Sequence, residues 1–308
     1  MLSTKFHLPR DSNLPWDDDD LFGVSFGNEN LRLIGSCNGF ICLLNGSRYD
    51  ENHSVYINNP LLGEYFKVKL PEWEKRVRGV AYAFCFSEGS GQYKVLRSVI
   101  RKFRGRPEVS ELEVYTLGVD EKWRNVGEAP YPLCGSFGNA NVNGVLHWLK
   151  DDENTKISAS IYSFNIGTEE VKPLPTPLGL KTPSLGLMLA EFGNSLCLSD
   201  KGDLWWMKEY GIAESWTKDR ILTDSILLDS RYKRFIPIMT WKDGEILMQC
   251  KRGTQLVSYN PKEKKFREVN VHGSGTAATR YIPSFYSLKT VMGESFQVSN
   301  AYPKTEIV

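Results

Sequence analysis

Few residues in this sequence have the types and spacing that enzyme chemistry requires. The four histidines, at positions 7, 53, 147 and 272, are scattered and form no HExxH pair that would hold a zinc ion. No GxSxG sequence presents a nucleophilic serine, and the glycine pairs near residues 90 and 274 lack the Lys-Ser/Thr of a phosphate loop. We therefore expect no catalytic residues, no metal site and no cofactor.

One group of carboxylates leaves an enzyme open as an alternative. Asp151, Asp152 and Glu153 are adjacent, whereas glycoside hydrolysis uses two carboxylates that face each other across the scissile bond. Adjacent acids in a polar stretch are more typical of a solvated loop. A sugar-binding or glycoside-processing protein is therefore the less favoured interpretation, and a broad substrate screen would test it.

Other residues have the chemistry of protein interfaces, where Trp, Tyr and Arg dominate the binding energy. Trp73 lies between charged residues in PEWEKR, and residues 101–106 read RKFRGR. The alternative for Trp73 is packing on a neighbouring element, and the alternative for the arginines is a solvated loop. His147, in GVLHWL, is expected in the core, as are the tryptophans at repeating positions.

The elements that would position these residues are β-strands. Short runs rich in Val, Ile, Tyr, Phe and Trp are separated by Asn38-Gly39, Asn143-Gly144, Gly193-Asn194 and Asp243-Gly244. Asn-Gly and Asp-Gly accept the positive φ of tight hairpin turns. The best helical candidate, residues 223–234, is short, so the pattern predicts an all-β protein.

The strand pairs repeat about every 50 residues. Five segments each have the pattern of a hairpin whose second strand begins near an aromatic or apolar residue: 55–68, 113–126, 160–174, 204–222 and 256–269. A second predicted hairpin precedes each of them. Four antiparallel strands per repeat describe the blades of a β-propeller. We predict six blades: five are clear, and residues 276–292 with the N-terminal segment would close the sixth.

The order of these segments resembles the F-box-associated domain of plant F-box proteins, the type whose propeller is related to kelch repeats. The matching pieces include GSCNGFICL (35–43), INNPLLGEYFKVKLP (57–71), NVNGVLHWL (141–149) and LVSYNPKEKKFREV (256–269). The resemblance implies a protein-interaction module that recognises the substrate of a cullin ubiquitin ligase. It also implies an F-box that docks on a Skp-type adaptor.

The helical F-box expected before such a propeller is not visible in this sequence. About 30 residues precede GSCNGF, and they contain Pro9, Pro15 and an acidic run without helical periodicity. The ligase-docking half is therefore expected to be absent or outside this chain. The alternative function is a stand-alone propeller that binds a target without delivering it.

We predict three segments: residues 1–30, partly irregular and able to contribute a closing strand; residues 31–292, the F-box-associated propeller; and residues 293–308, a C-terminal tail. In each blade, the loop between the second and third strands opens on the same face as the loop that leads to the next blade. That longer-loop face is the predicted partner site. Its predicted contacts are Trp73, Arg101, Arg104, Arg106, Tyr131 and Tyr232.

The composition of the chain narrows its expected cellular location and its expected partners. The formal net charge is +1, which gives no general case for nucleic acid or for an acidic membrane. The N-terminus lacks the apolar core of a signal peptide, and the six cysteines form no CxxC pair. We expect a cytoplasmic or nuclear protein, not a secreted one, whose partner is an unidentified target protein.

Overall fold

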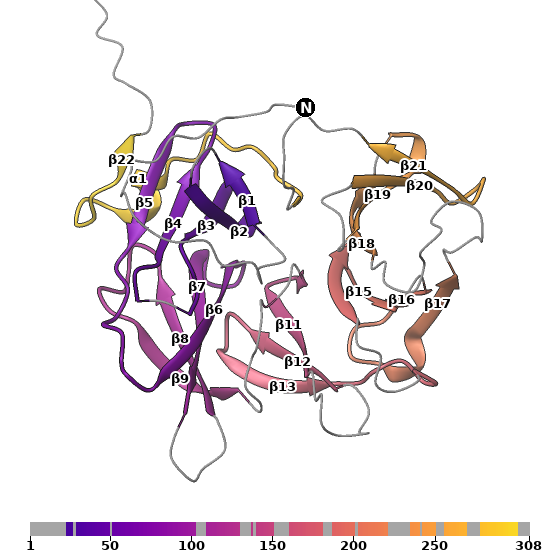
Figure 1. Cartoon of the computed structure of the whole chain (residues 1–308), viewed down its shortest axis with the longest axis horizontal. Helices are drawn as coiled ribbons and strands as arrows, with labels where there is room; N and C mark the ends of the chain where they lie inside the picture. Colours follow the sequence, from indigo (N-terminus) through magenta and orange to yellow (C-terminus); the bar gives the residue numbers. More distant parts are fainter. Residues whose placement is uncertain are drawn as a thin grey trace, which may run out of the picture. The chain divides into compact units, whose positions relative to one another are not determined.

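The computed structural model describes residues 23–26, 29–49, 51–102, 109–129, 137, 140–150, 160–180, 187–200, 203–220, 235–240, 242–250, 256–269 and 278–300. Over these residues the regular structure is almost entirely β-strand (Figure 1). The chain divides into two compact units, Met1–Ser136 with Tyr281–Val308, and Phe137–Arg280. The prediction of an all-β protein is confirmed.

The first sheet of the first unit has six strands in the order β1-β2-β3-β4-β5-β22, all antiparallel. Both ends of the chain therefore add a strand to the same four-stranded blade. The bounds are β1 Gly23–Phe26, β2 Glu29–Cys37, β3 Phe40–Asn45, β4 Ser54–Asn59, β5 Glu64–Val68 and β22 Ser299–Asn300.

The second sheet of this unit is a four-stranded meander whose strands are β6 Val77–Ser87, β7 Gln92–Arg101, β8 Val109–Thr116 and β9 Arg124–Ala129. The two sheets share one apolar core, to which Phe40 and Ile57 contribute from the first sheet and Val95 and Tyr115 from the second. These side chains are fully or almost fully buried. Burial of this apolar area is the main stabilising term for the unit.

A C-terminal strap, residues 281–292, closes one end of the first unit. The Asn59 amide donates to the carbonyls of Ser284 at 3.1 Å and Tyr286 at 2.9 Å, and the Glu64 carboxylate accepts from the backbone of Leu288 at 2.7 Å. The strap ends in a short helix, α1 Leu288–Met292, which lies beside β5 in Figure 1. Leu288 and Met292 are buried in the core, so the strap is an integral part of the unit.

The second unit contains three four-stranded antiparallel sheets in the order β10-β11-β12-β13, β14-β15-β16-β17 and β18-β19-β20-β21. Two 3-10 turns, Ala213–Ser215 and Lys242–Gly244, lie in the β16–β17 and β18–β19 connections. The bounds are β10 Asn141–Val142, β11 Val145–Lys150, β12 Ser160–Asn165, β13 Glu170–Leu174, β14 Met188–Phe192, β15 Ser195–Asp200, β16 Asp203–Met207, β17 Trp216–Arg220, β18 Phe235–Thr240, β19 Ile246–Cys250, β20 Leu256–Asn260 and β21 Lys265–Val269.

The hairpin predictions agree with these strands. Each of the four predicted turn pairs contains residues with positive φ, for example Asn38 at 43° and Gly39 at 91°. Within the outer hairpins, a repeated asparagine organises the turn. The side-chain oxygen of Asn59, Asn165 or Asn260 accepts backbone N–H bonds of 2.9–3.2 Å from residues two and three positions later.

The strands predicted over residues 276–292 for a sixth blade are not formed in the part described, residues 278–292. There the backbone carbonyls accept hydrogen bonds from the Asn59 side chain and, at the end of the strap, α1 forms. Ser287 caps this helix by accepting from the N–H of Lys289. The described strands thus make five sheets, and the helical candidate at residues 223–234 lies outside the described residues.

Two repeat-position tryptophans join consecutive sheets through their indole N–H. Trp123 donates to the carbonyl of Lys69, just after β5, and Trp216 donates to that of Pro175, just after β13, at 2.9 and 3.0 Å. In each case the acceptor belongs to the segment that leaves the preceding sheet of the same unit. Their expected role in packing is confirmed, since Trp216 is buried and Trp123 packs against the core.

We expect Trp216→Phe to lower the free energy of unfolding by about 1–2 kcal/mol, because the change removes this hydrogen bond and leaves a small void. Trp205→Phe in the same sheet is the matched control. Among the described residues the Trp205 ring lies 5.1 Å from Nζ of Lys218, and its indole N–H makes no hydrogen bond there. Urea denaturation followed by circular dichroism measures both. An equal loss of stability in the two variants would show that the Trp216 hydrogen bond does not stabilise the fold.

His147 lies in the interior of the second unit, as predicted. One ring nitrogen is hydrogen-bonded to the carbonyl of Ala140 at 3.0 Å and the other to the hydroxyl of Tyr210 at 2.8 Å. Burial lowers the pKa of His147 from 6.5 to about 4, although the bond to Ala140 opposes this shift. The histidine is therefore neutral in the folded protein at neutral pH.

This lowered pKa makes stability depend on pH in a defined window. Between pH 6.5 and about 4 the unfolded chain binds a proton at His147 that the folded chain does not. The stabilising contribution of neutral His147 is therefore fully present above pH 6.5. As the pH falls towards 4, this group lowers the free energy of unfolding by about 3 kcal/mol. In urea titrations at both pH values, His147→Gln should lose less stability across this window than the unchanged chain. The same loss in both proteins would contradict the assignment.

Candidate protein-interaction surface

Three connections meet at one end of the first unit. In an antiparallel meander, the β3–β4, β5–β6 and β7–β8 connections all leave at the same end of their sheets. Val80 N–H donates to the carbonyl of Arg48 at 3.0 Å, and Lys102 N–H donates to that of Arg76 at 3.1 Å. We call this region the loop end: residues 46–49, 51–53, 69–78, 101 and 102.

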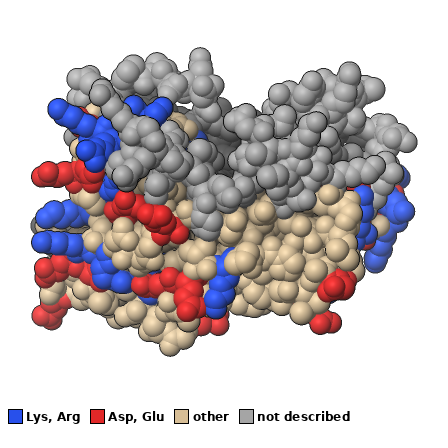
Figure 2. Space-filling model, turned by 90° about the horizontal axis from the view of Figure 1, so that it is seen from below, with Lys and Arg blue, Asp and Glu red and all other residues tan. Residues whose placement is uncertain are grey.

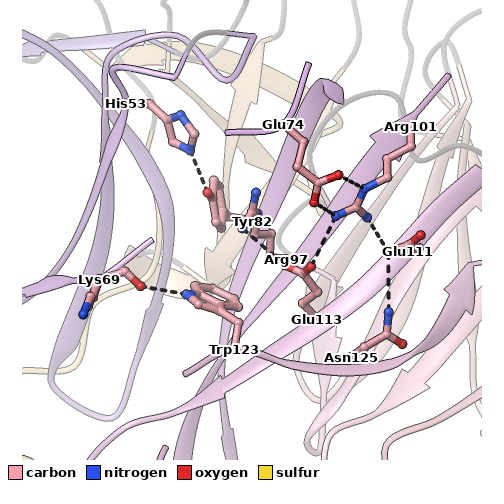
Figure 3. Close-up of polar contacts among 10 residues, drawn as sticks. All are labelled: His53, Lys69, Glu74, Tyr82, Arg97, Arg101, Glu111, Glu113, Trp123 and Asn125. Atoms are coloured by element: carbon pink, nitrogen blue, oxygen red, sulfur yellow. Dashed lines mark hydrogen bonds and ion pairs between the residues drawn. The ribbon is translucent and has the colours of Figure 1, made fainter. Parts of the chain in front are cut away.

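Arg101, the last residue of β7, holds the β5–β6 connection against the second sheet. Its guanidinium donates to both carboxylate oxygens of Glu74, at 3.4 and 3.0 Å, and also pairs with Glu111 and with Glu113 at 3.8 Å (Figure 3). The bond from Arg101 lowers the pKa of Glu74. Although burial opposes it, the bond to Glu74 and the nearby carboxylates raise the pKa of Arg101.

A buried ion pair lies beneath this contact. Arg97 on β7 is 3% exposed and lies 3.2 Å from Glu113, its directly opposite neighbour on β8. The guanidinium of Arg97 also lies 5.8 Å from the ring of Trp123, a cation–π arrangement. Burial raises the pKa of Glu113, while Arg97 and Arg101 oppose the shift. The pair fixes the spacing of β7 and β8 below the loop end.

Aromatic residues attach the β3–β4 connection to β6 and to the β5–β6 connection. His53 Nε2 and the Tyr82 hydroxyl lie 2.7 Å apart, which ties the β3–β4 connection to β6 (Figure 3). The rings of Trp73 and His53 pack in a T-shaped arrangement with their centroids 5.6 Å apart. Burial raises the pKa of Tyr82, so its hydroxyl stays protonated. Side-chain contacts of Arg101, His53 and Trp73 therefore hold the β3–β4 and β5–β6 connections in place.

The structure places two of the six predicted contact residues. Trp73 is half-buried and packs against the core, which is the alternative that its sequence context left open, and Arg101 is largely engaged by carboxylates. Both residues lie at the loop end, which belongs to the face that the longer loops were predicted to form. Arg104, Arg106, Tyr131 and Tyr232 lie outside the described residues. That these side chains contact a partner stays a prediction.

Sequence reasoning missed the most exposed aromatic residue of the loop end. Tyr49 is 53% exposed, and its ring lies over the guanidinium of Arg48, 5.0 Å from the ring centre. Arg48 also donates to the Tyr49 hydroxyl at 2.9 Å. The loop sequence NGSRYDENHS does carry a signal, because it contains one aromatic residue among polar ones. The position of the Tyr49 ring, however, depends on Gly79, which is distant in sequence and on which the ring rests.

Both signs of charge occur on the face of the described residues that Figure 2 draws. Figure 2 shows basic and acidic side chains of the described residues lying side by side on the face that it draws. No helix in the described parts of the chain is long and apolar enough to cross a membrane.

Comparison with known families decides the class of the protein. The model of the F-box associated beta propeller domain matches residues 5–295, nearly the whole chain. The chain belongs to this family. The β-propeller predicted from the repeats is thereby confirmed, with the five described sheets as its blades.

Relatives of this F-box-associated domain include two proteins of Arabidopsis thaliana. An F-box protein is 30% identical over 281 residues, covering 78% of this chain and 66% of the relative. An F-box/kelch-repeat protein is 23% identical, covering 75% and 64%. The chain thus spans about two thirds of the length of these relatives. A chain from the crystal structure of a nidogen/laminin complex is 11% identical, covering 79% and 81%, with a TM-score of 0.42; the family assignment does not depend on it.

Proposed function

We propose that this F-box-associated propeller recognises a target protein for an SCF-type cullin ubiquitin ligase and has no catalytic activity of its own. Membership of the family over residues 5–295 carries the proposal, because the named relatives are F-box proteins. An F-box would supply the contact to a Skp-type adaptor and, through it, to the cullin. The propeller contributes the target-binding half of that assembly.

The geometry of the first unit supports a binding role. Loops that a rigid sheet holds in place are where recognition residues concentrate. The loop end is fixed by the Arg101–Glu74 pair, the His53–Tyr82 contact and a buried ion pair. Such preorganisation lowers the entropy lost on binding. The target belongs to the cytoplasm or nucleus, where ubiquitin ligases of this class act.

The experiment is affinity capture from plant extract with two forms of the protein. One is this chain, and the other is this chain with the F-box of its Arabidopsis relative fused before residue 1. We expect both forms to recover the same target proteins. Only the fused form should also recover a Skp-type adaptor and a cullin, and its target should accumulate ubiquitin chains.

The outcomes separate the alternatives. Recovery of adaptor and cullin by the unfused chain would mean that the chain itself docks on the ligase. Shared targets that are never ubiquitinated in the fused form would favour a stand-alone binding module. If neither form recovers a reproducible target, the recognition role is wrong.

A further inference from the structure

The loop end carries an excess of basic side chains in the first unit. Lys75, Arg78 and Lys102 are exposed, and no ion pair among the described residues involves them. Arg78 lies at the β-bulge between Val77 and Gly79, and bulges commonly redirect a side chain away from the sheet. The basic residues of the loop end are Arg48, Lys69, Lys75, Arg76, Arg78, Arg101 and Lys102, and its acidic residues are Glu51, Glu72 and Glu74.

The nearest acid does not cancel this excess. Glu74 is held by two hydrogen bonds from Arg101, so its charge is already paired within the protein. Arg101 is also shared with Glu111 and Glu113, which places it in the support of the surface. The exposed cations at positions 75, 78 and 102 remain available to solvent and to a partner.

An aromatic platform lies among these cations. The ring of Tyr49 rests on Gly79 so closely that a Cβ added there would come within 3.0 Å of it. Arg48 holds the ring from its own loop by a hydrogen bond and a cation–π contact. A half-exposed tyrosine whose position is already fixed loses little entropy on binding, as is common for interface hot spots.

We propose that the loop end binds an acidic segment of the target protein that contains an apolar or aromatic residue. That residue packs on Tyr49, and the acidic side chains pair with Lys75, Arg78 and Lys102. This inference rests on the proposed function, which requires a target but does not fix its chemistry. A protein segment fits better than nucleic acid, because Glu51 and Glu72 interrupt the basic surface and the net charge of the chain is only +1.

The test uses defined probes and fluorescence anisotropy. The probes are a fluorescein-labelled copolymer of glutamate and tyrosine, a glutamate homopolymer of the same length, and duplex DNA of equal charge. The variant K75E/R78E/K102E should weaken copolymer binding about tenfold. K122E/K208E/K262E makes the same change of charge at exposed lysines that are not part of the loop end, and it is expected to leave binding unchanged. The neutral variant K75Q/R78Q/K102Q should lie between.

A second pair of variants tests the platform. Tyr49→Ala should weaken binding of the copolymer about tenfold but barely change that of the homopolymer. Gly79→Ala, which keeps the tyrosine but displaces its ring, should act in the same direction. Gly89→Ala is the control, because nothing lies near an added Cβ there. Melting temperatures establish that each variant folds.

Three results would overturn the inference: no binding of the copolymer, equal binding by loop-end and control variants, or tighter binding of DNA than of the copolymer. Each of these can occur while affinity capture still recovers a target. In that case the propeller recognises its target by other chemistry, and the proposed function stands.

Discussion

Replacing Glu113 by leucine is expected to lower the free energy of unfolding by about 3–5 kcal/mol, because it leaves a buried charge without its partner. Arg97 is 3% exposed and lies 3.2 Å from this carboxylate. Arg97→Met should cost less, because Glu113 is more exposed than Arg97 and keeps Arg101 at 3.8 Å. The double variant R97M/E113L should be more stable than either single variant, because it removes both charges and replaces them with apolar groups of similar size.

An exposed ion pair provides the control for this cycle. Glu170 and Lys172 lie 2.8 Å apart but are 56% and 70% exposed, so Glu170→Leu should change stability by at most about 1 kcal/mol. Urea denaturation of all four variants gives the comparison. If Glu113→Leu costs no more than the control, or if the double variant is the least stable, the buried pair does not have the role assigned to it.

The second large effect is expected at Gly118, where the turn after β8 meets the C-terminal strap. A Cβ at this position would lie 2.0 Å from the carbonyl oxygen of Val291 and 3.2 Å from Cα of Met292. Its φ is +72°, a conformation that side chains other than glycine disfavour. Gly118→Ala should therefore displace the strap and expose Leu288 and Met292, at a cost of about 3 kcal/mol or more.

Two other glycines in the same unit separate the causes. Gly91 has a φ of +67° with open space around an added Cβ, so Gly91→Ala should show only the backbone strain of about 1–2 kcal/mol. Gly89 has neither constraint, so Gly89→Ala should be near neutral. A melting-temperature series in which Gly118→Ala resembles Gly91→Ala would show that the strap is not packed against this turn.

Local sequence signals predicted most of the fold. The Asn-Gly and Asp-Gly pairs identify hairpin turns because few other residues accept positive φ at both positions. The six-residue interval from Asn59 to Tyr65, repeated from Asn165 and Asn260, reflects turns that the asparagine side chain closes itself. Such features depend on neighbours in sequence, and so they can be recognised from one sequence.

The strap was not predictable in this way. Asn59 and Ser284, which bond to each other, are 225 residues apart, and neither position carries a signal for the other. The apolar residues of the strap resemble those of a strand, and only the carboxylate of Glu64 and the cap at Ser287 explain why a helix begins there. The sixth blade was predicted from residues 276–292 together with the N-terminal segment, and neither segment carries a signal that specifies its strand partner.

The candidate site was predicted at the level of loops but not of side chains. The alternation of antiparallel strands places the β3–β4 and β5–β6 connections together, as the contact between His53 and Trp73 shows. Sequence could not tell that Arg101 faces Glu111 and Glu74, because that depends on the register of β7 with β8. Nor could it tell that His53 covers Trp73 while Tyr49 stays exposed.

The most direct test of a protein-binding loop end is site-specific photo-crosslinking. A photoreactive phenylalanine analogue replaces Tyr49 in one variant and Lys262, on the exposed β20–β21 turn, in another. After irradiation in plant extract, the account predicts a discrete protein adduct at position 49, competed by the glutamate–tyrosine copolymer, and none at position 262. Adducts at position 262 alone, or equal labelling at both positions, would contradict the claim that the loop end binds the target.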